Sequence, residues 1–88
     1  MYALSIRPEL RKKLEKITKK DPRLAEIIVK KTEEIIQNPQ HYKNLRKPLQ
    51  HWKRVHIAGS FVLTFSVDEN TKTVILEDFD HHDFIYKH

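Results

Sequence analysis

The spacing of apolar residues changes partway along the chain, and this change is the strongest constraint on its fold. Between residues 8 and 36, apolar side chains recur every three or four positions, as in a helix that buries one face. After residue 50 they alternate with polar residues, as in a strand with one buried face. This switch predicts an α+β protein in which helices cover one face of a sheet.

Two helices are predicted before the switch. Pro8 suits the first position of one helix, and Asp21-Pro22 supplies an N-cap acid followed by a proline for the next. The second helix ends before Asn38-Pro39. A turn near Lys20 would join the two helices into an antiparallel hairpin.

Four strands are predicted around these helices, at residues 2–6, 52–57, 61–67 and 73–77. Gly59, the only glycine, lies between the second and third strands, where a tight reversal is needed. The element order is β-α-α-β-β-β. We therefore expect one domain spanning residues 1–88, with an antiparallel sheet and a two-helix hairpin packed on one face.

Length and composition exclude several classes. A chain of 88 residues supports one compact core. It contains no apolar run long enough to cross a membrane, and its first residues do not resemble a signal peptide. The absence of cysteine gives no indication of an oxidising compartment. The expected location is the cytoplasm, without membrane association.

Charge is distributed unevenly along the chain, whose net charge is +5. No carboxylate occurs from Ile35 to Val67, whereas the stretch from Asp68 to Asp83 is strongly acidic. The acid-free stretch contains the cations Lys43, Arg46, Lys47, Lys53 and Arg54. This asymmetry favours a polyanion-facing patch, although a solvated charged surface is the alternative.

The uncovered face of the predicted sheet is the natural place for this patch. If Val55 and Ile57 face the helices, the residues that face away are Trp52, Arg54, His56, Val62, Thr64 and Ser66. Cations interleaved with aromatics suit nucleic acid, because Lys and Arg neutralise phosphates while aromatic rings stack on bases. The alternative is that Trp52 covers the sheet edge and the cations are solvated.

The segment Asp80-His81-His82-Asp83 raises the question of a metal site. Adjacent strand residues point to opposite faces, so His81 and His82 cannot easily share one ion. No cysteine or helical His pair supplies further ligands. We expect neither a metal nor a cofactor.

The order and spacing of these elements resemble the RelE/ParE superfamily of type II toxins, most closely the RelE-like mRNA interferases. The resemblance extends from Tyr2 to Tyr86. Its most specific pieces are Asn38-Pro39, Leu45 to Leu49, Arg54 to Ile57, Phe61 to Phe65 and His81 to Tyr86.

The resemblance implies a toxin that cleaves mRNA in the ribosomal A site and so inhibits translation. In that chemistry the 2′-hydroxyl attacks the adjacent phosphate in line. One group takes the hydroxyl proton, another protonates the leaving 5′-oxygen, and cations stabilise the phosphorane. The resemblance also implies an acidic, helical, RelB-like antitoxin that neutralises the toxin, and a toxin–antitoxin complex that binds operator DNA.

Carried over residue by residue, the resemblance assigns roles with two departures. Arg54 and His56 match two basic residues that the family places two apart on the second strand. Val62 stands where the family often has an arginine, and His82 stands where the closing motif has another. Tyr86 matches the family's tyrosine.

Because histidine exchanges a proton near neutral pH but does not clamp phosphate as arginine does, these departures suggest redistributed roles. Arg54, with Lys43 or Arg46, would hold phosphate, and His82 would be a general acid or base. His56 is a second proton-transfer candidate, and Tyr86 would stack or assist. The remaining RNA-binding candidates are Lys47, Trp52 and Lys53. His81 and Asp83 would form a structural pair. Surface histidines without a role are the alternative.

Two other functions remain open from the sequence. ParE-like members of the superfamily lack the nuclease residues and poison DNA gyrase, and the loss of two arginines fits that branch. A plain RNA-binding module without catalysis is the third possibility.

Overall fold

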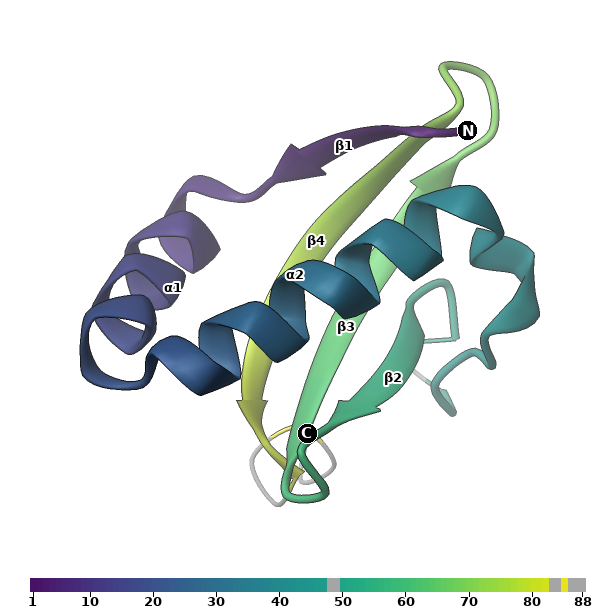
Figure 1. Ribbon diagram of the computed structural model, residues 1–88. Helices are drawn as coiled ribbons and strands as arrows, with labels where there is room; N and C mark the ends of the chain where they lie inside the picture. The colour runs from purple at the N-terminus through teal and green to yellow at the C-terminus, as the bar shows by residue number, and fades with distance from the viewer. Residues whose placement is uncertain (48–49, 83–84, 86–88) are drawn as a thin grey trace.

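The computed structural model describes residues 1–47, 50–82 and 85, and forms a two-layer α+β structure (Figure 1). The helices are α1 (Pro8–Lys20) and α2 (Pro22–Gln37), and a short 3₁₀ turn follows at Pro39–His41. The strands are β1 (Ala3–Ile6), β2 (Lys53–Ile57), β3 (Phe61–Asp68) and β4 (Thr73–His81). The helix hairpin lies across one face of a four-stranded sheet, which confirms the predicted class and element order.

The sheet is mixed, with strand order β1-β4-β3-β2. β2, β3 and β4 form the expected antiparallel meander, but β1 pairs in parallel with β4, from Ala3 opposite Thr73 to Ile6 opposite Leu76. The prediction of an antiparallel sheet is therefore wrong for β1. The sequence pattern identifies strands by their period, and that period is the same for either direction of pairing.

The helix boundaries follow from local chemistry. Pro8 and Pro22 occupy the first turns of α1 and α2, where a missing N–H leaves no bond unmade. The Asp21 side chain accepts a hydrogen bond from the backbone N–H of Leu24 at 3.1 Å and so caps α2. The predicted hairpin of two helices is confirmed. Within the described residues, neither helix is long and apolar enough to span a membrane.

The main core lies between the helices and the sheet. Its fully or nearly fully buried members are Leu10, Leu24, Ile28, Ile35, Ile57, Leu63, Phe65, Val74, Leu76 and Phe79. They come from both helices and from β2, β3 and β4, so one apolar layer joins the hairpin to the sheet. β1 contributes Ile6 at the margin of this layer.

A bulge interrupts the pairing of β3 with β4. Thr64 lies opposite Asp78 and Phe65 lies opposite Leu76, which leaves Glu77 without a partner on β3. An extra residue of this kind turns a side chain that regular alternation would aim elsewhere. Here it places Glu77 and Asp78 in one groove, although they are neighbours on a strand.

Glu77 is held by two partners across the sheet. Arg7 Nε donates to Glu77 Oε1 at 2.8 Å, and Ser66 Oγ donates to Glu77 Oε2 at 2.5 Å. The Glu77 side chain is only 6% exposed, whereas that of Arg7 is 56% exposed. The hydrogen bond and charge of Glu77 raise the pKa of the Arg7 guanidinium.

Lys13 of α1 covers the edge of β4 that β1 leaves open. β1 stops opposite Leu76, and beyond that point Lys13 Nζ donates to the carbonyl oxygen of Phe79 at 3.1 Å. The same ammonium pairs with Asp78 Oδ1 and Asp80 Oδ2, both at 3.1 Å. A lysine on a free strand edge also discourages pairing with another chain.

Charge pairing at this edge shifts two pKa values. Burial lowers the pKa of Lys13, but the hydrogen bonds and charges of Asp78 and Asp80 outweigh it, so the net shift is upward. Burial raises the pKa of Asp80, but the backbone N–H of His81 and the ammonium of Lys13 outweigh it, so the net shift is downward.

The turn between β2 and β3 spans Ala58, Gly59 and Ser60. Gly59 has a φ of 79°, as its place in a tight reversal predicts. Ala58 also has a positive φ, 52°, which an L side chain adopts at a cost.

Candidate functional site

Two histidines proposed from the sequence lie against each other at one end of the sheet. The rings of His56 on β2 and His82 just after β4 are stacked, with centroids 5.7 Å apart and planes inclined by 27°. Both side chains belong to exposed residues. The structure therefore brings together two proton-transfer candidates that are remote in sequence and leaves them accessible.

The β2–β3 turn fixes the position of His82. Its backbone N–H donates to the carbonyl oxygen of Ser60 at 2.8 Å. His56 lies opposite Val62, and Val62 lies opposite Asp80, so these three residues form one row across β2, β3 and β4 near the turn. His82 follows this row directly and is attached to the same turn that begins after β2.

Arg54 lies on the same face of β2 as His56. The two residues are two positions apart, about 6.6 Å along a strand. Arg54 Nη1 donates to the carbonyl oxygen of Asn44 at 2.9 Å, which attaches the guanidinium to the loop before β2. Asn44 pairs with Lys53 as an isolated bridge, and Arg54 N–H donates to Lys43 O, so this loop acts as a short extra strand beside β2.

Lys53 has a structural role in this loop. Its ammonium donates to the carbonyl oxygen of Tyr42 at 3.1 Å and to Asn44 Oδ1 at 2.9 Å. Tyr42 in turn packs edge-on against Phe65 of the core, with ring centroids 5.7 Å apart. Lys53 thus points toward the loop and the core side, away from the row that contains Arg54 and His56.

The other predicted cations remain at the surface. Lys43, Arg46 and Lys47 are exposed on the loop before β2. Leu45, between them, is buried and 5% exposed, and its N–H donates to Trp52 O at 2.8 Å. The loop is therefore anchored by Leu45 while its cations face solvent, as a phosphate-binding surface requires.

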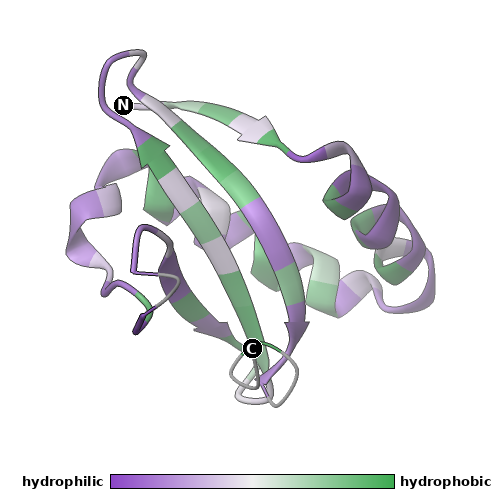
Figure 2. Cartoon of the chain, turned by 180° about the vertical axis from the view of Figure 1, so that it is seen from behind, coloured by the Kyte–Doolittle hydropathy of each residue, from purple (hydrophilic) through white to green (hydrophobic). Residues whose placement is uncertain are grey.

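The strands seen from the side away from the helices carry apolar as well as polar residues (Figure 2). Val62 and Thr64 point away from the main core, yet both have no exposed surface. Leu45 and Ile85 are also buried outside the main core cluster. The expectation that Val62 and Thr64 line an open face is corrected, because both residues are fully buried.

The remaining part of the closing motif is only partly described. His81 lies opposite Phe61, and their rings make an edge contact at 5.9 Å, so His81 faces the helix side. Tyr86 and Asp83 lie outside the described residues, as therefore does the predicted His81–Asp83 pair. Within residues 1–47, 50–82 and 85, no three His, Asp or Glu side chains converge to hold a metal ion.

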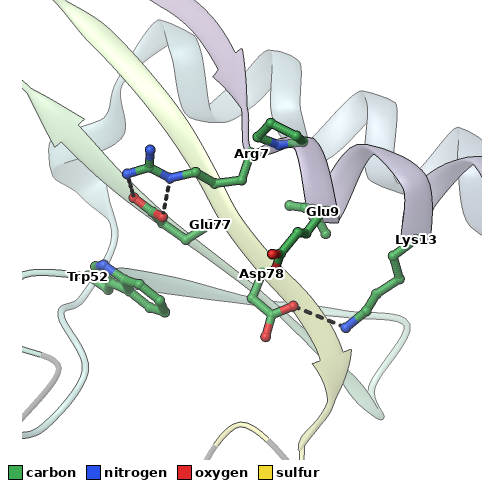
Figure 3. A pocket seen from close by; sticks show the side chains of 8 residues that line it. Arg7, Glu9, Lys13, Trp52, Glu77 and Asp78 are labelled. Carbon is green, nitrogen blue, oxygen red and sulfur yellow. Dashed lines mark hydrogen bonds and ion pairs between the residues drawn. The ribbon is translucent and has the colours of Figure 1, made fainter.

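A groove of about 630 Å³ lies between the start of α1 and the loop before β2 (Figure 3). Trp52 forms one wall, and Arg7, Lys13, Glu77 and Asp78 line the opposite side. Of these, only Trp52 was a candidate from the sequence. Glu77 and Asp78 carry no sequence signal, because the bulge that turns them into the groove depends on pairing with β3.

Comparisons with known proteins agree on one superfamily. A family model described as the ParE toxin of type II toxin–antitoxin systems, parDE, matches residues 4–86. A Methanocaldococcus jannaschii protein named "Putative toxin RelE4" is 62% identical over 87 residues, which cover 99% of this chain and 93% of that protein.

Two solved structures share the fold at lower identity. A chain in the RelBE2 toxin–antitoxin complex of Mycobacterium tuberculosis matches with a TM-score of 0.77 and 23% identity, over 92% of this chain and 98% of that one. The isolated RelE toxin of E. coli matches with a TM-score of 0.76 and 18% identity, over 92% of this chain and 84% of that one. The family match and the close relative confirm the predicted resemblance: this chain belongs to the ParE toxin family, within the RelE/ParE superfamily of type II toxin–antitoxin toxins.

Proposed function

We propose that this toxin is a ribosome-dependent mRNA endoribonuclease that cleaves by in-line attack of a 2′-hydroxyl, with His56 and His82 as its proton-transfer pair. The observation that carries the proposal is the stacking of these two exposed rings at 5.7 Å. In the transition state the attacking 2′-oxygen and the leaving 5′-oxygen are both partly bonded to one phosphorus, on opposite sides of it. Two groups that serve them must therefore lie close together and be accessible to RNA.

In the proposed reaction, one imidazole accepts the 2′-hydroxyl proton while the new bond to phosphorus forms. The other imidazole, in its protonated form, gives a proton to the 5′-oxygen as its bond to phosphorus breaks. The products are a 2′,3′-cyclic phosphate and a free 5′-hydroxyl. One histidine has gained a proton and the other has lost one. The geometry does not distinguish which histidine is the base, so both belong in the test.

Stabilising the phosphorane needs fixed positive charge, and Arg54 supplies it in this proposal. It lies on the same face as His56, and its guanidinium is oriented by the Asn44 carbonyl. The exposed cations Lys43, Arg46 and Lys47 would bind neighbouring phosphates of the mRNA or the ribosome. Lys53 is not assigned a phosphate, because its ammonium is held by the loop.

The test is primer extension on an mRNA in a reconstituted translation reaction. Wild-type protein is compared with Arg54→Ala, His56→Ala and His82→Ala. We expect cuts only when ribosomes are present, and a loss of about 10²- to 10⁴-fold for each histidine variant. His41→Ala is the matched control, because His41 is an exposed histidine in the 3₁₀ turn, outside the stacked pair, and should leave the cuts unchanged.

Undiminished cutting by both histidine variants would contradict the assigned roles. Cleavage of RNA in the absence of ribosomes would contradict the proposed dependence on the ribosome. The competing candidate is a non-catalytic, ParE-like poison of DNA gyrase, which the description of the matching family and the valine at position 62 favour. Growth arrest without any RNA cleavage, together with inhibition of gyrase supercoiling, would establish that candidate instead.

We also propose an acidic, helical antitoxin as the partner. The related RelBE2 chain comes from a toxin–antitoxin complex, and the charge of +5 on this chain favours an acidic protein. An apolar groove of about 400 Å³ between β1 and the helix hairpin, with the exposed side chains of Leu4 and Val29 in its lining, would accept an amphipathic helix. The proposal extends to operator DNA as a ligand of the complex and to the cytoplasm as its location.

A further inference from the structure

The groove between the start of α1 and the loop before β2 has one aromatic wall and one charged wall (Figure 3). Trp52 stands on one side, and on the other are Arg7, Glu9, Lys13, Glu77 and Asp78. Its volume of about 630 Å³ is in the range of small-molecule sites. None of the chemistry proposed for the histidines uses it.

The charges in this groove are unsuited to phosphate. Arg7 is already bound to Glu77, and Lys13 is already bound to Asp78 and Asp80, so neither cation is left over for an anion. Glu9 adds a further exposed carboxylate to the lining. A phosphate would meet carboxylate oxygens here, whereas a neutral group that donates hydrogen bonds would find acceptors.

Trp52 adds a flat aromatic surface directly before the strand that carries Arg54 and His56. It lies two positions before Arg54 and four before His56, about 13 Å from His56 along an extended chain. Its carbonyl is fixed by Leu45 N–H at 2.8 Å, and its ring touches His51 edge-on. A base stacked on this ring would place its sugar–phosphate backbone toward Arg54.

We propose that this groove is a nucleobase subsite that prefers guanine, and that it selects the RNA sequence presented to the histidine pair. The proposal rests on the proposed nuclease function for its role in cleavage, but not for the binding itself. Guanine carries two adjacent donors, N1–H and the exocyclic amine, which one carboxylate accepts together. Adenine and cytosine offer an amine beside an acceptor, and uracil offers a single N–H between two acceptors.

Asp78 is the carboxylate assigned to the base. Both oxygens of Glu77 are occupied by Arg7 and Ser66, and its side chain is only 6% exposed. The Asp78 side chain is 41% exposed, and Lys13 and the N–H of Phe79 both contact its Oδ1. Lys13 and the N–H of Phe79 therefore hold Asp78 through Oδ1, and Oδ2 is the oxygen assigned to the base.

Trp52 is the only tryptophan in the chain, so its fluorescence reports directly on occupancy of the groove. The experiment titrates the full-length protein with GMP, AMP, CMP and UMP in turn. We expect GMP to change the emission at concentrations where UMP has no effect. Asp78→Asn should weaken GMP binding by at least about fivefold, as loss of a hydrogen bond to a charged group does.

Glu26→Gln is the matched control, because Glu26 is exposed on α2 outside the groove and its change also removes one negative charge. A circular dichroism spectrum identical to wild type establishes that Asp78→Asn is folded. Equal responses to all four nucleotides, or to none, would overturn the proposal. So would a GMP affinity that Asp78→Asn leaves unchanged.

The two proposals fail in distinguishable ways. His56→Ala and His82→Ala should abolish RNA cleavage but leave the GMP titration intact. If GMP binds and no RNA is cut, the subsite stands and the nuclease proposal falls. If RNA is cut with no preference for guanine, and Asp78→Asn leaves the cut positions unchanged, the nuclease stands and the subsite falls.

Discussion

His56 and His82 meet because a short turn holds both of them. His56 lies at the end of β2, and the turn that follows it provides the carbonyl of Ser60 that accepts the N–H of His82. A change in the turn therefore alters the relative position of the two rings without touching either side chain. Ala58 is the residue of this turn in which such a change is most informative.

Ala58→Asn is expected to stabilise the protein by about 0.5–1 kcal/mol. Ala58 has a φ of 52°, in the left-handed region that asparagine adopts more readily than alanine, and it is exposed. Urea unfolding of the two proteins measures the difference. Ser60→Ala keeps the backbone of the turn and serves as the control. A midpoint for Ala58→Asn at or below that of wild type would show that the turn is not strained.

At the scale of single residues, the sequence made His56 and His82 proton-transfer candidates but did not predict that their rings would stack. Arg54 and His56 share a face because strand alternation requires it, and this was predictable. The contact of His56 with His82 depends on the length of β4, which reaches His81 rather than ending near residue 77. Lys53 was assigned to RNA from its charge alone, and its bonds to the loop could not be read from that charge.

At the scale of elements, α1 and β4 are joined by a clamp of ion pairs. Lys13 reaches two carboxylates and a carbonyl on the part of β4 that β1 does not cover. The side chains of Lys13, Asp78 and Asp80 are each about 40% exposed, so solvent screens these pairs. Their contribution to stability is accordingly modest.

Lys13→Met should destabilise the protein by about 0.5–1 kcal/mol near pH 7, within the range for partly exposed ion pairs. The pKa of Asp80 is lower in the folded state than its usual 3.8, so this stabilisation is present above that value and is lost as the pH falls through the folded pKa. The pKa of Lys13 is raised above its usual 10.5, so the stabilisation is also lost as the pH rises through the folded pKa.

The measurement is urea unfolding of wild type and Lys13→Met over a series of pH values. The difference between them should be constant from about pH 5 to 9 and shrink on both sides. Lys12→Met, on an exposed neighbour in α1, should show no such dependence. A difference that persists unchanged in strong acid would mean that packing of the lysine stem, rather than charge, holds the edge.

The elements themselves were predictable, and their pairing was not. The two helices begin at Pro8 and Pro22, as the caps indicate, and each expected strand is present. The parallel pairing of β1 and the bulge at Glu77 both depend on which strands meet, which a period-two pattern does not encode. The groove lined by Glu77 and Asp78 was invisible for the same reason.

At the scale of the whole molecule, two surfaces are separated by the sheet. The basic loop and the histidines lie with the uncovered face, and the apolar groove lined in part by Leu4 and Val29 lies between β1 and the helix hairpin. An antitoxin helix in that groove would bury apolar surface that monomeric proteins rarely expose as one patch. Its acidic residues would then be free to reach the basic loop.

Val29→Glu should weaken the complex with the acidic antitoxin at least about tenfold, because Val29 is 55% exposed and its burial is worth roughly 1.5 kcal/mol. Isothermal titration of the toxin with a candidate acidic antitoxin measures the affinity. Lys30→Gln makes the same unit change in charge on the next residue, outside the groove, and is the control. Equal weakening by both variants would show that the effect comes from charge alone and not from the groove. If the wild-type protein has no affinity for the candidate, the proposed antitoxin partner is rejected, and the proposed toxin function is rejected with it.

The position of β4 also constrains how the protein is made. β4 is the last strand in the sequence, yet it lies between β1 and β3 in the sheet. During synthesis, β1 has no neighbour until β4 has emerged, while α1 and α2 are already outside the exit tunnel. His82 follows β4 and joins His56 later still. A nascent chain therefore carries neither the complete sheet nor the histidine pair until β4 and the residue that follows it have left the ribosome.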